Sequence, residues 1–386
     1  MRRYSDEEER TIRTGRLARE WLRAGLIEPA QHARIAPELS VDLRRTNRFL
    51  RVTLFGFGLL IVAAAVGLLM VTLDVNSAAG AGATCLASAG PVWGLAEFLV
   101  GRFRLYRFGL EEACATGAAV LVAVGIGLAS EPLLSGRSGD PQLFIALIAG
   151  AAASFAVYWR FGYLYAAVAA MASLALSPFP FGLPLALERS LAALVLAACV
   201  VAARTMRRRH GDEYPGTDYA ALQAIALFGV YAVLNLQLFS VPAAVPHAFY
   251  WITYVTIWIV PLATFILAVR GRDRLLLDAA LVMGLATLVT NKSYLGLARE
   301  TWDPILLGVL LIGAAIALRR WLAAGEGGMR RGVTAARILR SDDDAVALAG
   351  LASAFQSAPA AAHHGAPPPD PFAGGRSGGG GASGTF

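Results

Sequence analysis

Five polar side chains stand inside or at the ends of long apolar stretches, where a charge or an amide is costly unless it meets a partner or a cavity. They are Glu97, Glu111, Glu112, Asn235 and Gln237. The carboxylates suit the binding of protons or cations, and the amides suit a ligand site. Buried amides also join one membrane helix to another, which explains them equally well. We take the five residues as candidate ligand or ion sites and leave both interpretations open.

The glutamates have arginines close by in the sequence. Arg102, Arg104 and Arg107 lie between Glu97 and Glu111. Charged side chains that flank membrane spans commonly reach the interface. The structural interpretation therefore predicts ion pairs between these glutamates and these arginines. The functional interpretation is a carboxylate cluster for protons or cations.

Signatures of enzymes, metal sites and nucleic-acid binding are absent from the sequence. It has no Gly-rich phosphate loop followed by Lys-Ser/Thr and no His-Glu-x-x-His. The histidines stand apart from other ligands, so we expect neither a metal nor a cofactor. The net charge of +7 comes from arginines clustered beside apolar stretches, without a base-reading motif. We expect no nucleic-acid partner and no enzyme, with a membrane enzyme lacking a known motif as a distant alternative.

Membrane-spanning helices are the elements that must position these side chains. The chain is 56% hydrophobic and 16% charged, whereas soluble chains have about 45–50% apolar and about 25% charged residues. Its apolar runs are about 17–24 residues long, enough to cross a hydrocarbon core about 30 Å thick. We predict an all-α, polytopic bundle of about ten transmembrane helices. Their ranges are 51–73, 78–100, 112–129, 142–159, 161–177, 185–203, 219–239, 249–269, 275–290 and 304–322.

The pair 142–159 and 161–177 is the weakest point in this count. Only Arg160-Phe161 separates the two ranges, so a single broken hairpin is the alternative to two spans.

The arginines alternate between the two sides of the predicted bundle. One side carries the clusters at 44–51, 102–107, 204–209, 270–274 and 319–320, together with Arg160. The other side carries only Arg137, Arg189, Lys292 and Arg299. Because positive residues concentrate in cytoplasmic loops, we predict that both termini are cytoplasmic. The charged N-terminus does not fit a cleavable signal peptide, so we expect the first span to remain as an anchor in the lipid bilayer.

Four regions follow from this organisation. Residues 1–48 form a cytoplasmic helical module, and residues 49–323 form the transmembrane bundle. Residues 324–356 are predicted to hold cytoplasmic amphipathic helices. Residues 357–386 are rich in Gly, Pro and Ala and are predicted to be disordered. In the first region, Ser5 and Glu8 match a capping box at a helix start.

A short motif in the N-terminal module resembles a known family. The motif is Trp21-Leu22-x-x-Gly25-Leu26-Ile27-x-x-x-Gln31, followed soon by a first span. It resembles uncharacterised bacterial polytopic membrane proteins that begin with a short helical cytoplasmic module (DUF2157-like). The resemblance implies the bacterial cytoplasmic (inner) membrane and this architecture, but no activity. We expect Trp21 and Leu26 to serve in packing and Gly25 to stop a helix.

Two functional hypotheses remain. The first is a transporter or permease for a small solute, which the packed spans, the short loops and the few inward-facing polar groups suggest. The second is a non-transporting membrane scaffold or sensor that recruits a cytoplasmic protein partner through its cytoplasmic ends. The first would need a water-filled cavity beside Asn235, Gln237 or Glu97. The sequence does not predict the substrate, the coupling ion or the oligomeric state.

Overall fold

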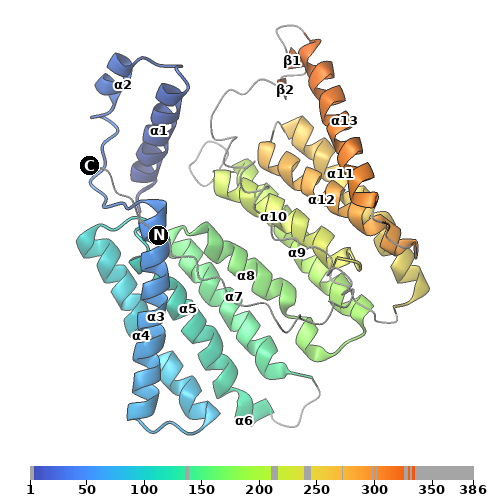
Figure 1. Ribbon diagram of the computed structural model, residues 1–386. Helices are drawn as coiled ribbons and strands as arrows, with labels where there is room; N and C mark the ends of the chain where they lie inside the picture. The colour runs from blue at the N-terminus through green and yellow to red at the C-terminus, as the bar shows by residue number, and fades with distance from the viewer. Residues whose placement is uncertain are drawn as a thin grey trace, which may run out of the picture. The chain divides into compact units, whose positions relative to one another are not determined.

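The computed structural model describes residues 4–134, 139–209, 216–238, 245–271, 273–297, 300, 302–325, 329–330 and 333–334. Nearly all of this part of the chain that has regular structure is helical (Figure 1). A two-residue antiparallel ladder, β1 (Met329–Arg330) with β2 (Val333–Thr334), is the exception. The amphipathic helix predicted within 324–356 and the tail predicted at 357–386 fall outside the described residues from residue 335 on.

The N-terminal module consists of α1 (Asp6–Arg23) and α2 (Pro29–Ile35). The predicted capping box is confirmed, because the Glu8 amide donates to the Ser5 hydroxyl oxygen over 3.2 Å. The predicted helix stop at Gly25 is also confirmed. Gly25 has a φ of +70°, and the amide of the next residue, Leu26, donates back to the Trp21 carbonyl over 2.9 Å. This pattern is a Schellman motif, which needs a left-handed residue at the position that Gly25 occupies.

The expected packing role of Trp21 and Leu26 is wrong. Their side chains are 39% and 58% exposed. The Schellman motif brings the two residues together at the end of α1, and α2 has no buried residue that would cover them. An apolar pair therefore lies on the surface of the module.

Ten longer helices follow the module. They are α3 (Arg48–Thr72), α4 (Ala78–Phe103), α5 (Leu110–Ala129), α7 (Pro141–Phe161), α8 (Leu164–Leu176), α9 (Leu185–Arg209), α10 (Gly216–Leu234), α11 (His247–Gly271), α12 (Arg274–Tyr294) and α13 (Asp303–Ala323). Short turns α6 (Glu131–Leu134) and η1 (Phe179–Phe181) join some of them. Among the described residues, eight helices are long and apolar enough to cross a membrane, with α8 extended through η1. The chain is a multi-pass membrane protein. Helices α10 and α13 occupy the ranges of the other two predicted spans.

The predicted ranges 142–159 and 161–177 form two helices. Helix α7 ends at Phe161, where Gly162 takes the left-handed conformation with a φ of +73°. Helix α8 starts two residues later, at Leu164, and packs against α7. The two ranges are therefore two separate helices joined by a tight turn, and the alternative of a single broken hairpin is wrong.

Helix α5 is central to the first half of the bundle, because it packs against α3, α4 and α7. Helices α9 to α12 form a second packed group, which meets the first through α8 (Figure 1). Small side chains such as Ala113, Ala115 and Ala118 are buried along α5, and small residues let membrane helices approach closely. The first turn of α5 carries Glu111 and Glu112.

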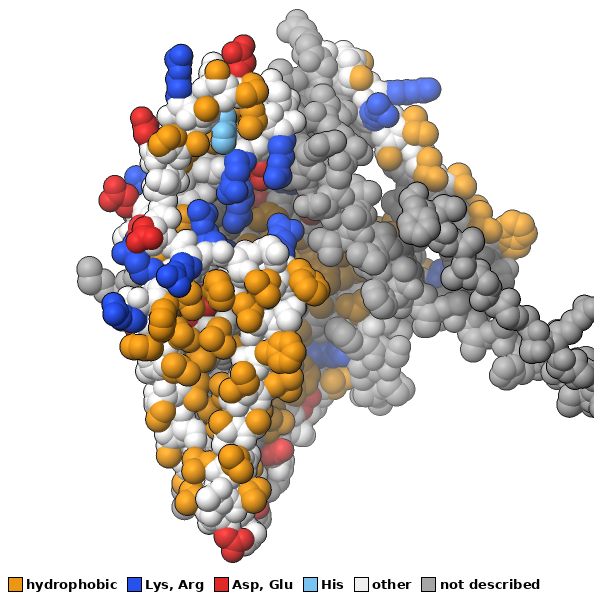
Figure 2. All heavy atoms as spheres, turned by 60° about the vertical axis from the view of Figure 1, so that its left-hand side comes forward, with side chains coloured by type: hydrophobic (Ala, Val, Ile, Leu, Met, Phe, Trp, Pro, Cys, Tyr) orange, Lys and Arg blue, Asp and Glu red, His pale blue; other side chains and the backbone are white. Residues whose placement is uncertain are grey.

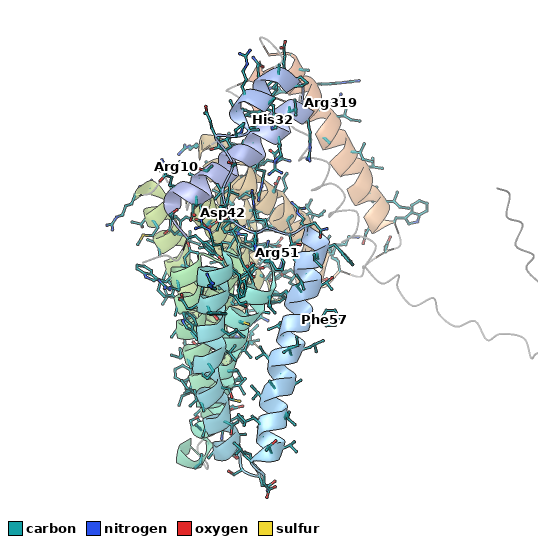
Figure 3. The ribbon with its side chains drawn as sticks, turned by 90° about the vertical axis from the view of Figure 1, so that its left-hand side faces the viewer. Arg10, His32, Asp42, Arg51, Phe57 and Arg319 are labelled. Carbon is teal, nitrogen blue, oxygen red and sulfur yellow. The ribbon has the colours of Figure 1, made fainter. Side chains whose placement is uncertain are left out.

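Apolar side chains cover the outer face of the first half of the bundle, and arginines gather at one end of it (Figure 2). Helix α3 shows this pattern along its length. Figure 3 shows Phe57 pointing outward from α3, and Arg51 near the start of the same helix, toward the module. The structure thus places the module at the arginine-rich end of an apolar bundle.

Candidate functional site at the junction of the module and the bundle

Tyr4 connects the N-terminal module to the bundle. Its hydroxyl donates to the Leu105 carbonyl over 2.9 Å and lies 3.5 Å from the Tyr163 hydroxyl. Its ring meets that of Tyr106 edge to face, with centroids 4.9 Å apart. Tyr4 and Ile12 belong to the same buried cluster as side chains of α4, α5 and α7. The module and the bundle therefore share a hydrophobic core at this junction.

A ring of polar contacts surrounds the Tyr4 contact. Arg104, which ends α4, donates from Nη2 to Glu8 Oε1 over 2.8 Å and from Nε to the Asp42 carbonyl over 2.6 Å. The backbone of Arg44 bonds with the same turn, since its amide donates to the Arg104 carbonyl over 2.9 Å and its carbonyl accepts from the Tyr106 amide over 3.0 Å. One turn of the bundle thus holds both the first helix of the module and the segment that leads into α3.

The two glutamates at the start of α5 lie beneath this junction. Glu112 forms a two-bond ion pair with Arg51 of α3, in which Nε lies 2.6 Å from Oε2 and Nη2 contacts Oε1. Glu111 is fully buried, and its Oε1 accepts from the Phe108 amide over 2.7 Å. Within the described residues, Glu111 Oε2 has no hydrogen-bond partner. The positive end of the α5 dipole favours negative charge at both positions.

Burial sets the ionisation of the two phenols at the junction. It raises the pKa of Tyr4 above its ordinary value, and the charges of Glu111 and Glu112 raise it further. Burial likewise raises the pKa of Tyr163, with contributions from Tyr4 and Glu111. Both phenols therefore stay protonated at physiological pH and serve as hydrogen-bond donors.

The junction can couple the position of the module to a charge in the bundle. The Tyr4 phenol and the Glu111 carboxyl are close enough to interact electrostatically, so a change at either group alters the environment of the other.

The predicted partners of the glutamates are wrong. Glu97 of α4 pairs with Arg160 at the end of α7, with Nε 2.5 Å from Oε1 and Nη2 3.0 Å from Oε2. Glu112 pairs with Arg51, while Arg104 turns toward the module. The packing of antiparallel helices brings distant arginines to these two acids, while Arg104 of the α4–α5 turn bonds with the module. The structural interpretation, that these two acids pair with arginines, therefore agrees with the observed contacts.

Asn235 and Gln237 lie in the second half of the bundle, just after the C-terminal end of α10 (Gly216–Leu234). The predicted span 219–239 placed them deep in a helix, but α10 ends at Leu234. Asn235 is fully buried, and its Nδ2 donates to Tyr231 over 2.9 Å and to Thr290 over 3.1 Å. Its Oδ1 accepts from the Gln237 amide over 3.2 Å. Both amide protons of Asn235 are used within the protein, which favours its role in joining α10 to α12.

Arg189 supports the same helix end and was not among the sequence candidates. Its side chain is buried, and its Nη1 donates to the Val233 carbonyl over 2.9 Å. The Tyr294 hydroxyl accepts from the Leu236 amide over 2.7 Å. Helix ends leave backbone groups without intrahelical partners, so a buried end needs such contacts. The signal in the sequence was an arginine within the first turns of an apolar span.

The structure therefore separates the five sequence candidates into three groups. Glu111 and Glu112 lie together at the junction, Glu97 forms its own ion pair with Arg160, and Asn235 with Gln237 lies at the far end of the other half. One cavity of the described residues lies along α4, α5 and α7, and another lies between α9, α10, α11 and α12. None of the five candidates lines either of them. Comparison with protein family models, with curated proteins and with solved structures finds no match to this chain.

Proposed function

We propose that the protein is a non-transporting sensor or scaffold of the bacterial cytoplasmic membrane, which recruits a cytoplasmic protein through its N-terminal module. The docking of Tyr4 carries this proposal. A buried tyrosine, in contact with the Leu105 carbonyl and Tyr163, fixes the module to the bundle. Docking beside the buried Glu111 gives the module a route to respond to the state of the bundle.

The proposed topology has ten spans, with both termini in the cytoplasm. Its support is the coincidence of the ten longer helices with the predicted ranges, together with the alternation of arginine clusters. In this topology the junction faces the cytoplasm, where a protein partner can reach it.

The proposed contact surface for the partner is the apolar pair Trp21 and Leu26. Tryptophan is among the commonest anchors of protein interfaces, and Leu26 extends the apolar surface beside Trp21. Their position at the end of α1 leaves them accessible while Tyr4 is docked at the other end of the helix. That this motif relates the chain to DUF2157-like proteins stays a proposal. If it holds, those proteins share the architecture of a short cytoplasmic module followed by membrane spans.

The transport hypothesis has less support. Asn235 donates both of its amide protons within the protein, and Glu97 and Glu112 are paired with arginines. A solute or ion at these positions would have to displace internal partners. We propose no catalytic activity.

Proximity labelling in the native cell tests the proposed function. With a labelling enzyme fused to the C-terminus, we expect the double variant Trp21→Ser, Leu26→Ser to lose about tenfold or more of the label on specific cytoplasmic proteins, since two interface anchors each contribute at least about 1.4 kcal/mol. The matched control is Arg13→Ser, Arg16→Ser, which changes two exposed residues of the same helix and should keep the labelled set.

A labelled set that is unchanged after deletion of residues 1–45 would contradict recruitment by the module. The competing hypothesis is tested on the purified chain in proteoliposomes. A solute flux that Asn235→Ala or Glu97→Gln abolishes, in variants that remain folded, would establish transport instead.

A further inference from the structure

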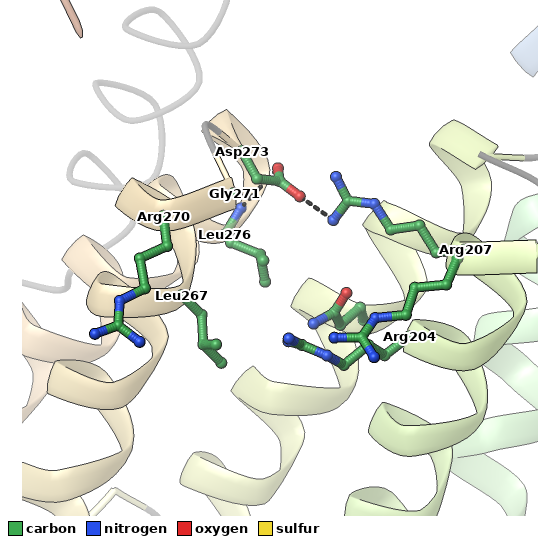
Figure 4. Close-up of a pocket in the computed structure, with 9 residues that line it drawn as sticks. Arg204, Arg207, Leu267, Arg270, Gly271, Asp273 and Leu276 are labelled. Atoms are coloured by element: carbon green, nitrogen blue, oxygen red, sulfur yellow. Dashed lines mark hydrogen bonds and ion pairs between the residues drawn. The ribbon is translucent and has the colours of Figure 1, made fainter. Parts of the chain in front are cut away.

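A basic cavity lies between the ends of four helices in the second half of the bundle (Figure 4). Its volume is about 410 Å³. It is lined by Arg204, Arg207, Arg208, Gln223, Leu267, Arg270, Gly271, Asp273 and Leu276. These residues come from α9, α10, α11, the turn after α11 and the start of α12, so the cavity exists only when the four helices are packed together.

Four arginines and a single aspartate give the lining a surplus of positive charge. Arg207 pairs with Asp273, whose other carboxylate oxygen caps α12 by accepting from the Leu276 amide over 3.4 Å. In the described part of the chain, Arg204, Arg208 and Arg270 have no carboxylate partner. In Figure 4, Arg204 and Arg270 lie on opposite sides of the cavity. Arg208 and Arg270 are exposed and Arg204 is partly buried, so an anion could reach all three from solvent and would offset their mutual repulsion.

Gln223 provides a second, independent sign of a missing ligand. It lies on α10 within the lining and is only 1% exposed. The described residues give its side-chain amide no hydrogen bond, and Gln223 borders the cavity. A buried amide normally has a partner, because its desolvation is otherwise uncompensated. A ligand oxygen in the cavity would supply that partner.

We propose that this cavity binds a phosphate-bearing anion, held by Arg204, Arg208 and Arg270 with Gln223 as a further donor. Guanidinium groups match the geometry of phosphate oxygens and form strong charge-assisted hydrogen bonds with them. Basic cavities between membrane helices are suited to the headgroups of anionic lipids. Leu267 and Leu276 add an apolar portion that would lie against the glycerol and acyl region of a lipid. A free phosphate offers the same chemistry without that apolar part.

Binding measurements on the full-length chain in phosphatidylcholine nanodiscs test this site and distinguish the two sources. One arm adds tail-labelled phosphatidylglycerol, and the other adds inorganic phosphate. We expect the double variant Arg204→Gln, Arg270→Gln to bind the responding probe at least about tenfold more weakly, because each arginine supplies a charge-assisted bond. Saturable binding of phosphatidylglycerol alone identifies a lipid site, and equal competition by inorganic phosphate identifies a soluble anion.

Two further variants separate a built site from general attraction. Arg319→Gln, Arg320→Gln removes the same charge from exposed positions on α13, outside the cavity, and should leave affinity unchanged. Arg204→Lys, Arg270→Lys keeps the charge and the fold while removing the guanidinium geometry, and should fall between wild type and the glutamine variant. The proposal is overturned if neither probe binds, or if the α13 variant weakens binding as much as the cavity variant. The cavity is separate from the junction. A negative binding result would therefore contradict the anion site and leave the proposed function unaffected.

Discussion

Replacing Arg51 by methionine is expected to destabilise the protein by about 3–5 kcal/mol, because it leaves the buried Glu112 carboxylate without its counter-charge. Glu112 is 2% exposed and receives both of its described ion-pair contacts from Arg51. Methionine preserves much of the length of the side chain, so the loss reports mainly on the ion pair. The free energy of unfolding, measured by denaturant titration in micelles, provides the test.

Two companion variants show that this effect belongs to the pair. Arg48→Met removes an exposed charge one turn earlier on the same helix and should change the free energy of unfolding by no more than about 0.5 kcal/mol. The double variant Arg51→Met, Glu112→Leu removes both charges and should recover most of the loss, since an apolar pair replaces a buried ion pair at little cost. Equal losses for Arg48→Met and Arg51→Met would contradict this interpretation.

Replacing Gly109 by alanine is expected to lower the free energy of unfolding by about 2–6 kcal/mol. Gly109 caps α5 with a φ of +113°, a conformation that costs other residues about 1–3 kcal/mol. An added Cβ would lie 2.4 Å from the Arg51 carbonyl oxygen, and overpacking of this kind adds about 1–3 kcal/mol. The clash would push the start of α5, with Glu112, away from Arg51.

Gly56→Ala is the matched control for this substitution, because no atom lies within 4 Å of the Cβ that it would add. Alanine favours a helix over glycine by up to about 1 kcal/mol, so this variant should be neutral or slightly more stable. The same denaturant titration measures both. If Gly109→Ala behaves like Gly56→Ala, the close approach of α3 and α5 at this point is wrong.

Features that depend on neighbours in the sequence were predictable. The capping box at Ser5 and the helix stop at Gly25 both appear as predicted, because each rests on contacts within a few residues. The long helices follow from apolar runs, since hydrocarbon requires every backbone group to be satisfied within its own segment.

Features that depend on how helices meet were not predictable. The partners of Glu97 and Glu112 are 63 and 61 residues away in the sequence. The end of α10 at Leu234 is set by Arg189 and Tyr294, which lie on other helices and donate to the Val233 and Leu234 carbonyls. The apolar run in the sequence continues past Leu234, so it does not indicate a helix end that other helices determine.

The candidate site was predicted only in part. Glu111 and Glu112 stood out because they are acids at the start of an apolar span. Tyr4 and Tyr163 did not, because a tyrosine in a polar segment or a short turn gives no signal by itself. Only the packing of the module on the bundle brings these four side chains together.

The most direct test of the account is a distance measurement between the module and the bundle. Spin labels at Arg16→Cys and Arg102→Cys, both exposed positions, would be placed in a chain whose Cys85, Cys114 and Cys199 are replaced by alanine. A docked module predicts one narrow distance distribution, which should broaden when Tyr4→Ala removes the buried ring and its hydrogen bond to Leu105. A distribution that is already broad with Tyr4 in place would contradict docking, and with it the proposed role of the junction.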